Sequence, residues 1–164
     1  MLHFLLTATI TLSIVAAPLF ANLLLHKKLK LEWNRDVYTY VIPILSGLIY
    51  ILARHLPEPN ITNESGTLAQ HFVGGGFISA LYMEYLIKEL KFKIPFFGRL
   101  LLLYPFVSMM GVTNELLEFS VTKLHIYAVD GTDVWWDLFA NTLGAYSLFF
   151  IYEISKKYIQ NAKK

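Results

Sequence analysis

Five long apolar blocks dominate this sequence, and each is close to the length that crosses a lipid bilayer as an α-helix. About 20 apolar residues in a helix span the roughly 30 Å hydrocarbon core. Only 16% of the residues are charged, whereas a soluble domain has about a quarter. We therefore expect an all-α fold, a polytopic membrane helix bundle in which residues 1–164 form a single integral-membrane domain. The expected transmembrane spans are about 2–25, 37–55, 68–88, 99–120 and 133–153.

The Lys and Arg residues are alternately scarce and abundant in the segments outside these blocks. In chain order, the segments before, between and after the apolar stretches 2–25, 37–53, 68–87, 100–119 and 133–152 hold 0, 4, 1, 4, 1 and 4 of them, which accounts for all 14. Loops rich in Lys and Arg stay in the cytoplasm. The alternation predicts a multi-pass protein of the cell membrane (inner or plasma) with its N-terminus outside and its C-terminus in the cytoplasm. We expect the first block to be a retained span, because its basic flank follows the apolar run and does not precede it as in a signal peptide.

The composition excludes several functional classes. The chain has no cysteine, so it has no catalytic thiol, no Cys-ligated zinc and no disulfide. The basic segments are interpreted as orientation signals that touch anionic lipid, so membrane lipid is an expected partner and nothing indicates a nucleic acid. The three glycines at 74–76 lack the Lys and Ser or Thr of a phosphate-binding loop. We expect them to allow close helix packing, and no cofactor-binding motif is identified.

Polar residues gather at one end of three predicted spans. A charge at the centre of a bilayer costs about 2.5–3.5 kcal/mol on insertion scales, so such residues usually have a function. Glu115 and Glu118 are i,i+3 neighbours on one face of the fourth span. Asp133, Asp137 and Asn141 follow one another at i,i+4 on one face of the fifth. The predicted topology places all of them in the outer half of the membrane.

A histidine at the start of the third span completes a carboxylate–histidine cluster that opens to the extracytoplasmic side. Four carboxylates close together repel one another and need a cation, a shared proton or water. Carboxylates with one imidazole suit Mg, Mn, Zn or Fe. A bound metal could activate water against a lipid-linked, envelope or small-molecule substrate. The candidate metal ligands are His71, Glu115, Glu118, Asp133 and Asp137; Glu115, Glu118 and Asp137 are also the candidate catalytic residues, with Asn141 and Asp130 as supporting residues that orient them.

Other interpretations of the cluster stay open. A coupled acid/base set suits proton chemistry or a small ion or solute transporter, and a transporter predicts a polar stripe that continues to the cytoplasmic side. A structural or partner-binding membrane subunit predicts acidic residues that tolerate alanine. The residues could instead lie at the water interface, with Asp133 as a helix N-cap and Glu118 as a solvated helix end.

One further acidic residue, Glu84, lies 13 residues beyond His71. At 1.5 Å per residue it is about 20 Å further along the same helix. It is therefore expected near the cytoplasmic face, where Lys88 is available as an i+4 partner.

Three sequence elements carry a family resemblance. The last predicted span begins with DGTDVWWDLFANTLGA at 130–145, which resembles the last-helix signature of the VanZ-like superfamily. The chain also resembles the YjdF-like inner-membrane proteins, in which comparable elements recur in the same order. Here these elements are QHF at 70–72, ELLEF at 115–119 and DGTDVWWDL at 130–138. The resemblance covers about residues 68–152, roughly half of the chain.

The chain departs from the pattern of the YjdF-like family at three positions. Gln70 stands where the family has Gly, Phe119 where it has Trp, and Met83 where it tends to have Arg. The resemblance implies a multi-spanning protein of the cell envelope. It does not imply a reaction, since the YjdF-like family has no characterised function and the mechanism of VanZ is not settled.

Overall fold

The computed structural model describes residues 2–29, 37–59, 61, 66–125 and 133–162, and these residues form helices and connecting segments without a strand. The expected all-α fold is confirmed. Three of the helical stretches, α3, η1 and α4, follow one another without a break, and η1 is a π-helix. The helices are α1 (Leu2–Leu29), α2 (Val37–Ala53), α3 (Leu68–Gln70), η1 (His71–Phe77), α4 (Ile78–Glu89), α5 (Phe96–Lys123) and α6 (Val134–Asn161).

Each expected span coincides with a helical stretch, but several helices are longer than the spans. Helix α1 continues to Leu29, α5 begins at Phe96, and α6 continues to Asn161, well past the expected end at residue 153. Basic residues occupy the last turn of α1, where a positive charge interacts favourably with the helix dipole. The apolar pattern marks only the part of a helix that can enter a membrane, so it underestimates helix length.

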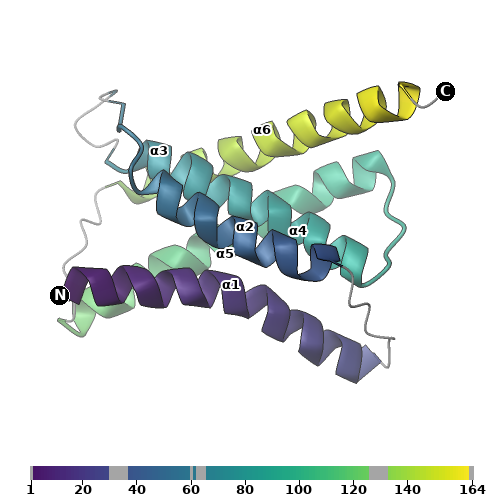
Figure 1. Ribbon diagram of the computed structural model, residues 1–164. Coiled ribbons are helices and arrows are strands. Elements are labelled where there is room, and N and C mark those ends of the chain that lie inside the picture. The colour runs from purple at the N-terminus through teal and green to yellow at the C-terminus, as the bar shows by residue number, and fades with distance from the viewer. Residues whose placement is uncertain (1, 30–36, 60, 62–65, 126–132, 163–164) are drawn as a thin grey trace.

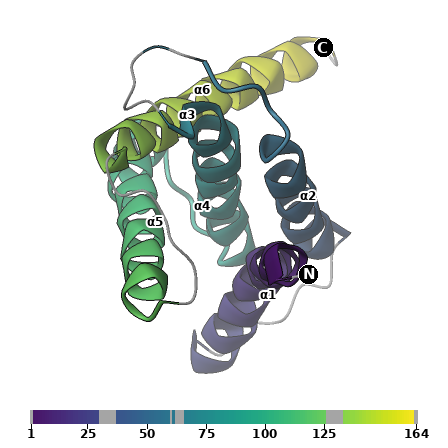
Figure 2. The same ribbon diagram turned by 90° about the vertical axis from the view of Figure 1, so that its left-hand side faces the viewer.

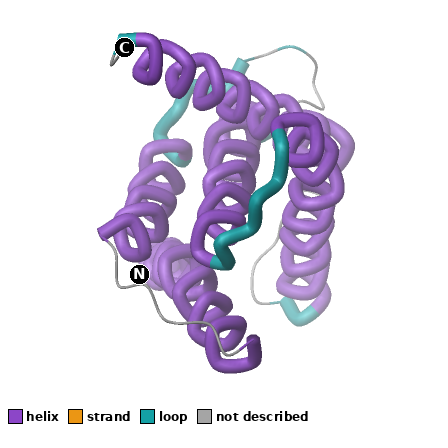
Figure 3. Tube along the Cα trace, turned by 90° about the vertical axis from the view of Figure 1, so that its right-hand side faces the viewer, coloured by secondary structure: helices purple, strands orange, loops and turns teal. Residues whose placement is uncertain are grey.

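The helices run back and forth between two ends of the bundle. Figure 1 shows the start of α1, the α3 segment, the end of α5 and the start of α6 at one end, which is called the α3 end below. The opposite end holds the end of α1, the start of α2, the end of α4 and the start of α5, and is called the α4 end. Figure 2 shows α1 beside α2, with α6 crossing over α5 and α4. The tube view in Figure 3 shows the loops joining the helices at their ends.

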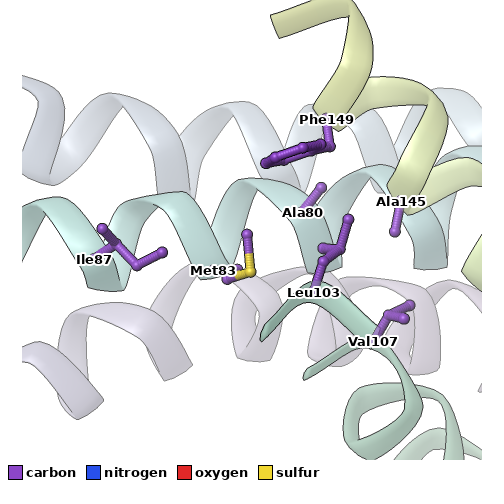
Figure 4. Close-up of a cluster of buried hydrophobic side chains, with 7 residues drawn as sticks. All are labelled: Ala80, Met83, Ile87, Leu103, Val107, Ala145 and Phe149. Carbon is purple, nitrogen blue, oxygen red and sulfur yellow. The ribbon is translucent and has the colours of Figure 1, made fainter. Parts of the chain in front are cut away.

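An apolar core lies among α4, α5 and α6. Ala80 and Met83 come from α4, Leu103 and Val107 from α5, and Phe149 from α6 (Figure 4). Each of these side chains is almost completely buried. Ile87 and Ala145 complete the cluster.

Glycines bring η1 and α6 into close contact, as the sequence predicted for the run at 74–76. A Cβ on Gly76 would lie 2.6 Å from the backbone oxygen of Asn141 and 2.8 Å from the backbone nitrogen of Ala145. A Cβ on Gly144 would overlap the backbone carbonyl of Phe72. The two backbones therefore approach as closely as small residues allow, and this contact determines how the start of α6 faces η1.

Two helices are long and apolar enough to cross a membrane in the described part of the chain. They are Thr7–Leu29, with 23 residues, and Phe96–Lys123, with 28. Helix α2 is also apolar but shorter, with 17 residues. Large apolar side chains such as Leu12 and Leu101 face outward from these helices.

Candidate functional site

The segment that leads into His71 is held by a side chain from the preceding loop. The Glu58 carboxylate accepts the backbone N–H groups of Ala69 at 2.6 Å and of Gln70 at 3.1 Å. These are N–H groups of the first helical turn, which have no partner within the helix. The chain then continues into the π-helix that His71 opens. Single π-helical turns within α-helices are frequent at functional sites.

His71 and Asp137 form the best-defined contact of the site. Nε2 of His71 lies 3.2 Å from Oδ2 of Asp137. The other carboxylate oxygen, Oδ1, accepts a hydrogen bond from the Thr67 hydroxyl at 3.3 Å. Asp137 is only 2% exposed although it lies in the first turn of α6. It is therefore a buried carboxylate bound from the α3–η1 segment.

Glu115 brings a second carboxylate to this pair from α5. One ligand atom from each of His71, Glu115 and Asp137 lies within 4.8 Å of the other two. Nitrogen and oxygen ligands bind a zinc ion at about 2.0–2.2 Å, so two ligands of one ion lie at most about 4.4 Å apart. Adjustments of a few tenths of an ångström would bring the three side chains onto one ion. In the described part of the chain, Oε1 of Glu115 is buried and has no hydrogen-bond partner.

Asn141 lies one turn beyond Asp137 and fills the space between α6, η1 and α5. A Cβ on Gly75 would overlap its Oδ1, and a Cβ on Gly111 would lie 3.3 Å from its Nδ2. Among the described residues, Oδ1 of Asn141 is buried without a hydrogen-bond partner. The predicted supporting role of Asn141 therefore has a structural basis, since the side chain is held where three helical segments meet.

The remaining predicted site residues do not join the group of three ligands. The Glu118 carboxylate accepts a hydrogen bond from Nδ2 of Asn114 at 2.7 Å. Asp133 is buried and lies against Gly66, at the N-cap position of α6 but without a capping hydrogen bond from its side chain. Asp130 lies outside the described residues. Three of the five predicted ligands are thus brought together, and the other two lie outside this group.

The expected pairing of Glu84 with Lys88 is wrong. Arg99, at the start of α5, donates from Nη1 to both carboxylate oxygens of Glu84 at 3.0 and 3.1 Å. Nη2 of Arg99 donates to Glu153 at 2.6 Å. The ammonium group of Lys88 lies 3.6 Å from the centre of the Tyr38 ring. The i+4 spacing relates residues of one helix only. Here the Arg99 guanidinium, from a neighbouring helix, binds the Glu84 carboxylate instead.

Two supporting residues, Thr67 and Glu58, are not predicted from the sequence. A signal for Thr67 was present, because a Thr directly before an apolar run is a common N-cap. Its hydroxyl makes no capping hydrogen bond and binds Asp137 instead. Glu58 takes over the capping role from 11 residues away, and no rule of local spacing predicts such a partner.

Comparisons of the chain with protein-family models, with curated proteins and with solved structures found no match. The chemistry of the site is therefore inferred from its residues. An imidazole and two carboxylates provide one nitrogen and several oxygen ligands with up to two negative charges. This set can bind a divalent metal ion or exchange protons among its members.

Proposed function

We propose that this chain is a multi-pass protein of the cell envelope whose His71, Glu115 and Asp137 bind one divalent metal ion on the extracytoplasmic side. The observation that carries the proposal is the convergence of three ligand atoms, from η1, α5 and α6, within 4.8 Å of one another. The two carboxylates would offset the charge of the ion, which explains why both occur at the meeting point of three helical segments. The resemblance of 130–145 to the VanZ-like signature agrees with an envelope protein.

The proposed chemistry is metal-assisted attack of water on a lipid-linked or surface substrate. A divalent ion lowers the pKa of bound water and polarises an acceptor group. Thr67 holds one oxygen of Asp137 and leaves the other for the ion. Trp135, Trp136 and Phe139 line a shallow apolar hollow on the first turns of α6, on a more exposed face of the helix than the buried Asp137. Trp135 is 81% exposed, which suits a site that meets lipid at the membrane interface.

The membrane arrangement that we propose has five spans, with the N-terminus outside and the C-terminus in the cytoplasm. The back-and-forth course of the helices in Figure 1 supports it, as does the outward-facing apolar surface of α1 and α5. In this arrangement the α3 end, with the site, is extracytoplasmic, and the α4 end is cytoplasmic.

Single cysteines test this topology, because the chain has none of its own. Leu124 and Phe92 are exposed and lie beyond opposite ends of α5. We expect Leu124→Cys to react with a membrane-impermeant maleimide in intact cells, and Phe92→Cys to react only after permeabilisation. The reverse pattern would contradict the orientation, and equal labelling of both residues in intact cells would contradict the crossing of α5.

A transport function receives less support from the interior of the bundle. The core residues of Figure 4 follow His71 and Asp137 and precede Glu115 along their helices, so the core lies on the α4-end side of the site. Two buried serines at mid-helix positions, Ser46 and Ser79, donate their hydroxyls to the carbonyls of Ile42 and Gly75 in the preceding turn. Both hydroxyls are therefore bound within their own helical stretches. They do not extend the polar stripe that a transporter needs.

The metal proposal is tested by elemental mass spectrometry of detergent-purified protein, incubated separately with Mg, Mn, Zn and Fe(II) and then desalted. We expect about one ion per chain for one of these metals. The double variant Glu115→Gln/Asp137→Asn should lose the ion and keep the fold, because each amide has the size of the acid it replaces. Glu118→Gln is the matched control and should keep the ion, since Asn114 already binds that carboxylate.

Two outcomes would count against the metal site. Wild-type protein that retains none of the four metals would exclude metal-dependent chemistry at this site, and would favour proton exchange or a structural role. Metal that persists in the double variant would place the ion elsewhere. Loss of metal in the single variant Glu118→Gln would show that Glu118 is also a ligand, as the sequence predicted.

A further inference from the structure

A second polar cluster lies at the α4 end, away from the site described above. It consists of Asn22 from α1, Thr39 from α2, and Tyr85 and Glu89 from α4. Asn22 and Thr39 are 0% exposed, and Tyr85 and Glu89 are 3% exposed. Thr39 is the third residue of α2 and Glu89 the last of α4, while Asn22 lies two turns before the end of α1. These helix ends meet at the α4 end in Figure 1. Three helices thus enclose a set of oxygen-bearing side chains.

The Glu89 carboxylate in this cluster accepts two hydrogen bonds but forms no ion pair with the residues that the structure describes. Thr39 donates its hydroxyl to Oε1 at 2.9 Å, and Nδ2 of Asn22 donates to Oε2 at 3.1 Å. Both donors are neutral. Among the described residues, the ion pairs involve His71 and Arg99, and none includes Glu89. A buried charge without a partner is costly, so this carboxylate should attract a positive charge.

The Asn22 side chain supplies a second, independent indication of a ligand. Its Nδ2 bridges Glu89 and the hydroxyl oxygen of Tyr85, at 3.1 and 3.0 Å. Its Oδ1 is buried and has no hydrogen-bond partner in the described part of the chain. Exchanging the two amide atoms would place Oδ1 against the carboxylate, so hydrogen bonding favours the observed orientation. A buried acceptor without a partner among the described residues therefore remains on the same side chain whose Nδ2 contacts the carboxylate.

We propose that this cluster binds one alkali cation, Na⁺ or K⁺, between α1, α2 and α4. The ligands are Oδ1 of Asn22 and the Glu89 carboxylate, with the Tyr85 hydroxyl oxygen completing the set. Carboxylate, amide and hydroxyl oxygens are hard ligands that suit hard cations. The cluster has one negative charge, which a monovalent ion neutralises and a divalent ion would exceed. This proposal does not depend on the metal site at the α3 end.

A buried cation at the α4 end, the Arg99 guanidinium, is already shared by two carboxylates. Arg99 is bound by both Glu84 and Glu153, so it is not available to Glu89. The Arg99 guanidinium links α5 to carboxylates of α4 and α6. The proposed cation would in the same way hold together side chains of α1, α2 and α4. It would link α1 to the rest of the bundle.

Thermal unfolding of the full chain in detergent, monitored in NaCl, KCl and choline chloride at equal ionic strength, tests the proposal. We expect the midpoint to rise in a saturable way with Na⁺ or K⁺ and not with choline, because a ligand that binds only the folded state stabilises it. Glu89→Gln and Asn22→Ala should each weaken the apparent affinity by about tenfold or more. Tyr85→Phe should weaken it less, since it removes only a neutral ligand. Equilibrium dialysis with the radioactive ion then measures binding directly, also in variants of altered stability.

Matched controls separate this site from general salt effects. Asn161→Ala, at the exposed end of α6, and Glu118→Gln, at the α3 end, should respond to the ion as the wild type does. Equal midpoints in the three salts, or an unchanged response in both Glu89→Gln and Asn22→Ala, would overturn the proposal. Direct binding that is unaffected by Glu89→Gln would do the same.

Discussion

Replacing Arg99 with methionine is expected to destabilise the bundle by about 3–5 kcal/mol, the cost of removing one partner from a buried ion pair. Arg99 is 8% exposed and donates three hydrogen bonds to two carboxylates on two other helices. Its loss would leave Glu84 and Glu153 close together without the guanidinium that binds both. We expect the midpoint of thermal unfolding in detergent to fall by about 10 °C.

A rescue experiment distinguishes lost charge compensation from lost packing around Arg99. The triple variant Arg99→Met/Glu84→Gln/Glu153→Gln removes all three charges at similar volume and should regain most of the stability, because neutralised buried networks are often tolerated. Arg99→Lys should be intermediate, since one ammonium cannot bind both carboxylates with the planar geometry of a guanidinium. A triple variant as unstable as Arg99→Met would show that the contact of Arg99 with the Phe149 ring, and not charge, accounts for the loss.

Gly144→Ala is expected to have the second large effect. The added Cβ would overlap the backbone carbonyl of Phe72, and a helix backbone cannot move aside as the end of a side chain can. We expect a loss of about 3 kcal/mol, the upper part of the usual range for overpacking. Because Gly144 is on the same α6 face as Asp137, the displaced helix should also separate Asp137 from His71. Thermal unfolding measures the first effect and metal content the second.

Gly74→Ala is the matched control for this packing contact. It belongs to the glycine run of η1, but its added Cβ would meet only the Cβ of Ala53, at 3.2 Å. The strain should be small and offset by the better helix propensity of alanine, worth up to about 1 kcal/mol. Similar losses in Gly74→Ala and Gly144→Ala would mean that glycine is needed for backbone conformation and not for the approach of α6.

The candidate site was largely predictable because its position depends on periodic and topological features. The spacing of Asp137 and Asn141 puts them on one face of any helix. An antiparallel course then brings the end of α5 level with the start of α6 and with His71. These features do not determine which carboxylate points inward. Glu115 and Glu118 are equally plausible from spacing, and the tertiary structure separates them, because an oxygen of Glu115 and not of Glu118 belongs to the group of ligand atoms within 4.8 Å of one another.

The sequence by itself determined that the chain is helical, roughly where its helices lie, and which polar residues share one end of the bundle. Local hydrophobicity and the 3.6-residue period are sufficient for that. The tertiary structure decided which groups meet across helices: Arg99 with Glu84, Thr67 with Asp137, and Asn22 with Glu89. The physical reason is that partner choice depends on the rotation and spacing of packed helices. Those are set by close backbone contacts such as that of Gly144 with Phe72, which no local pattern encodes.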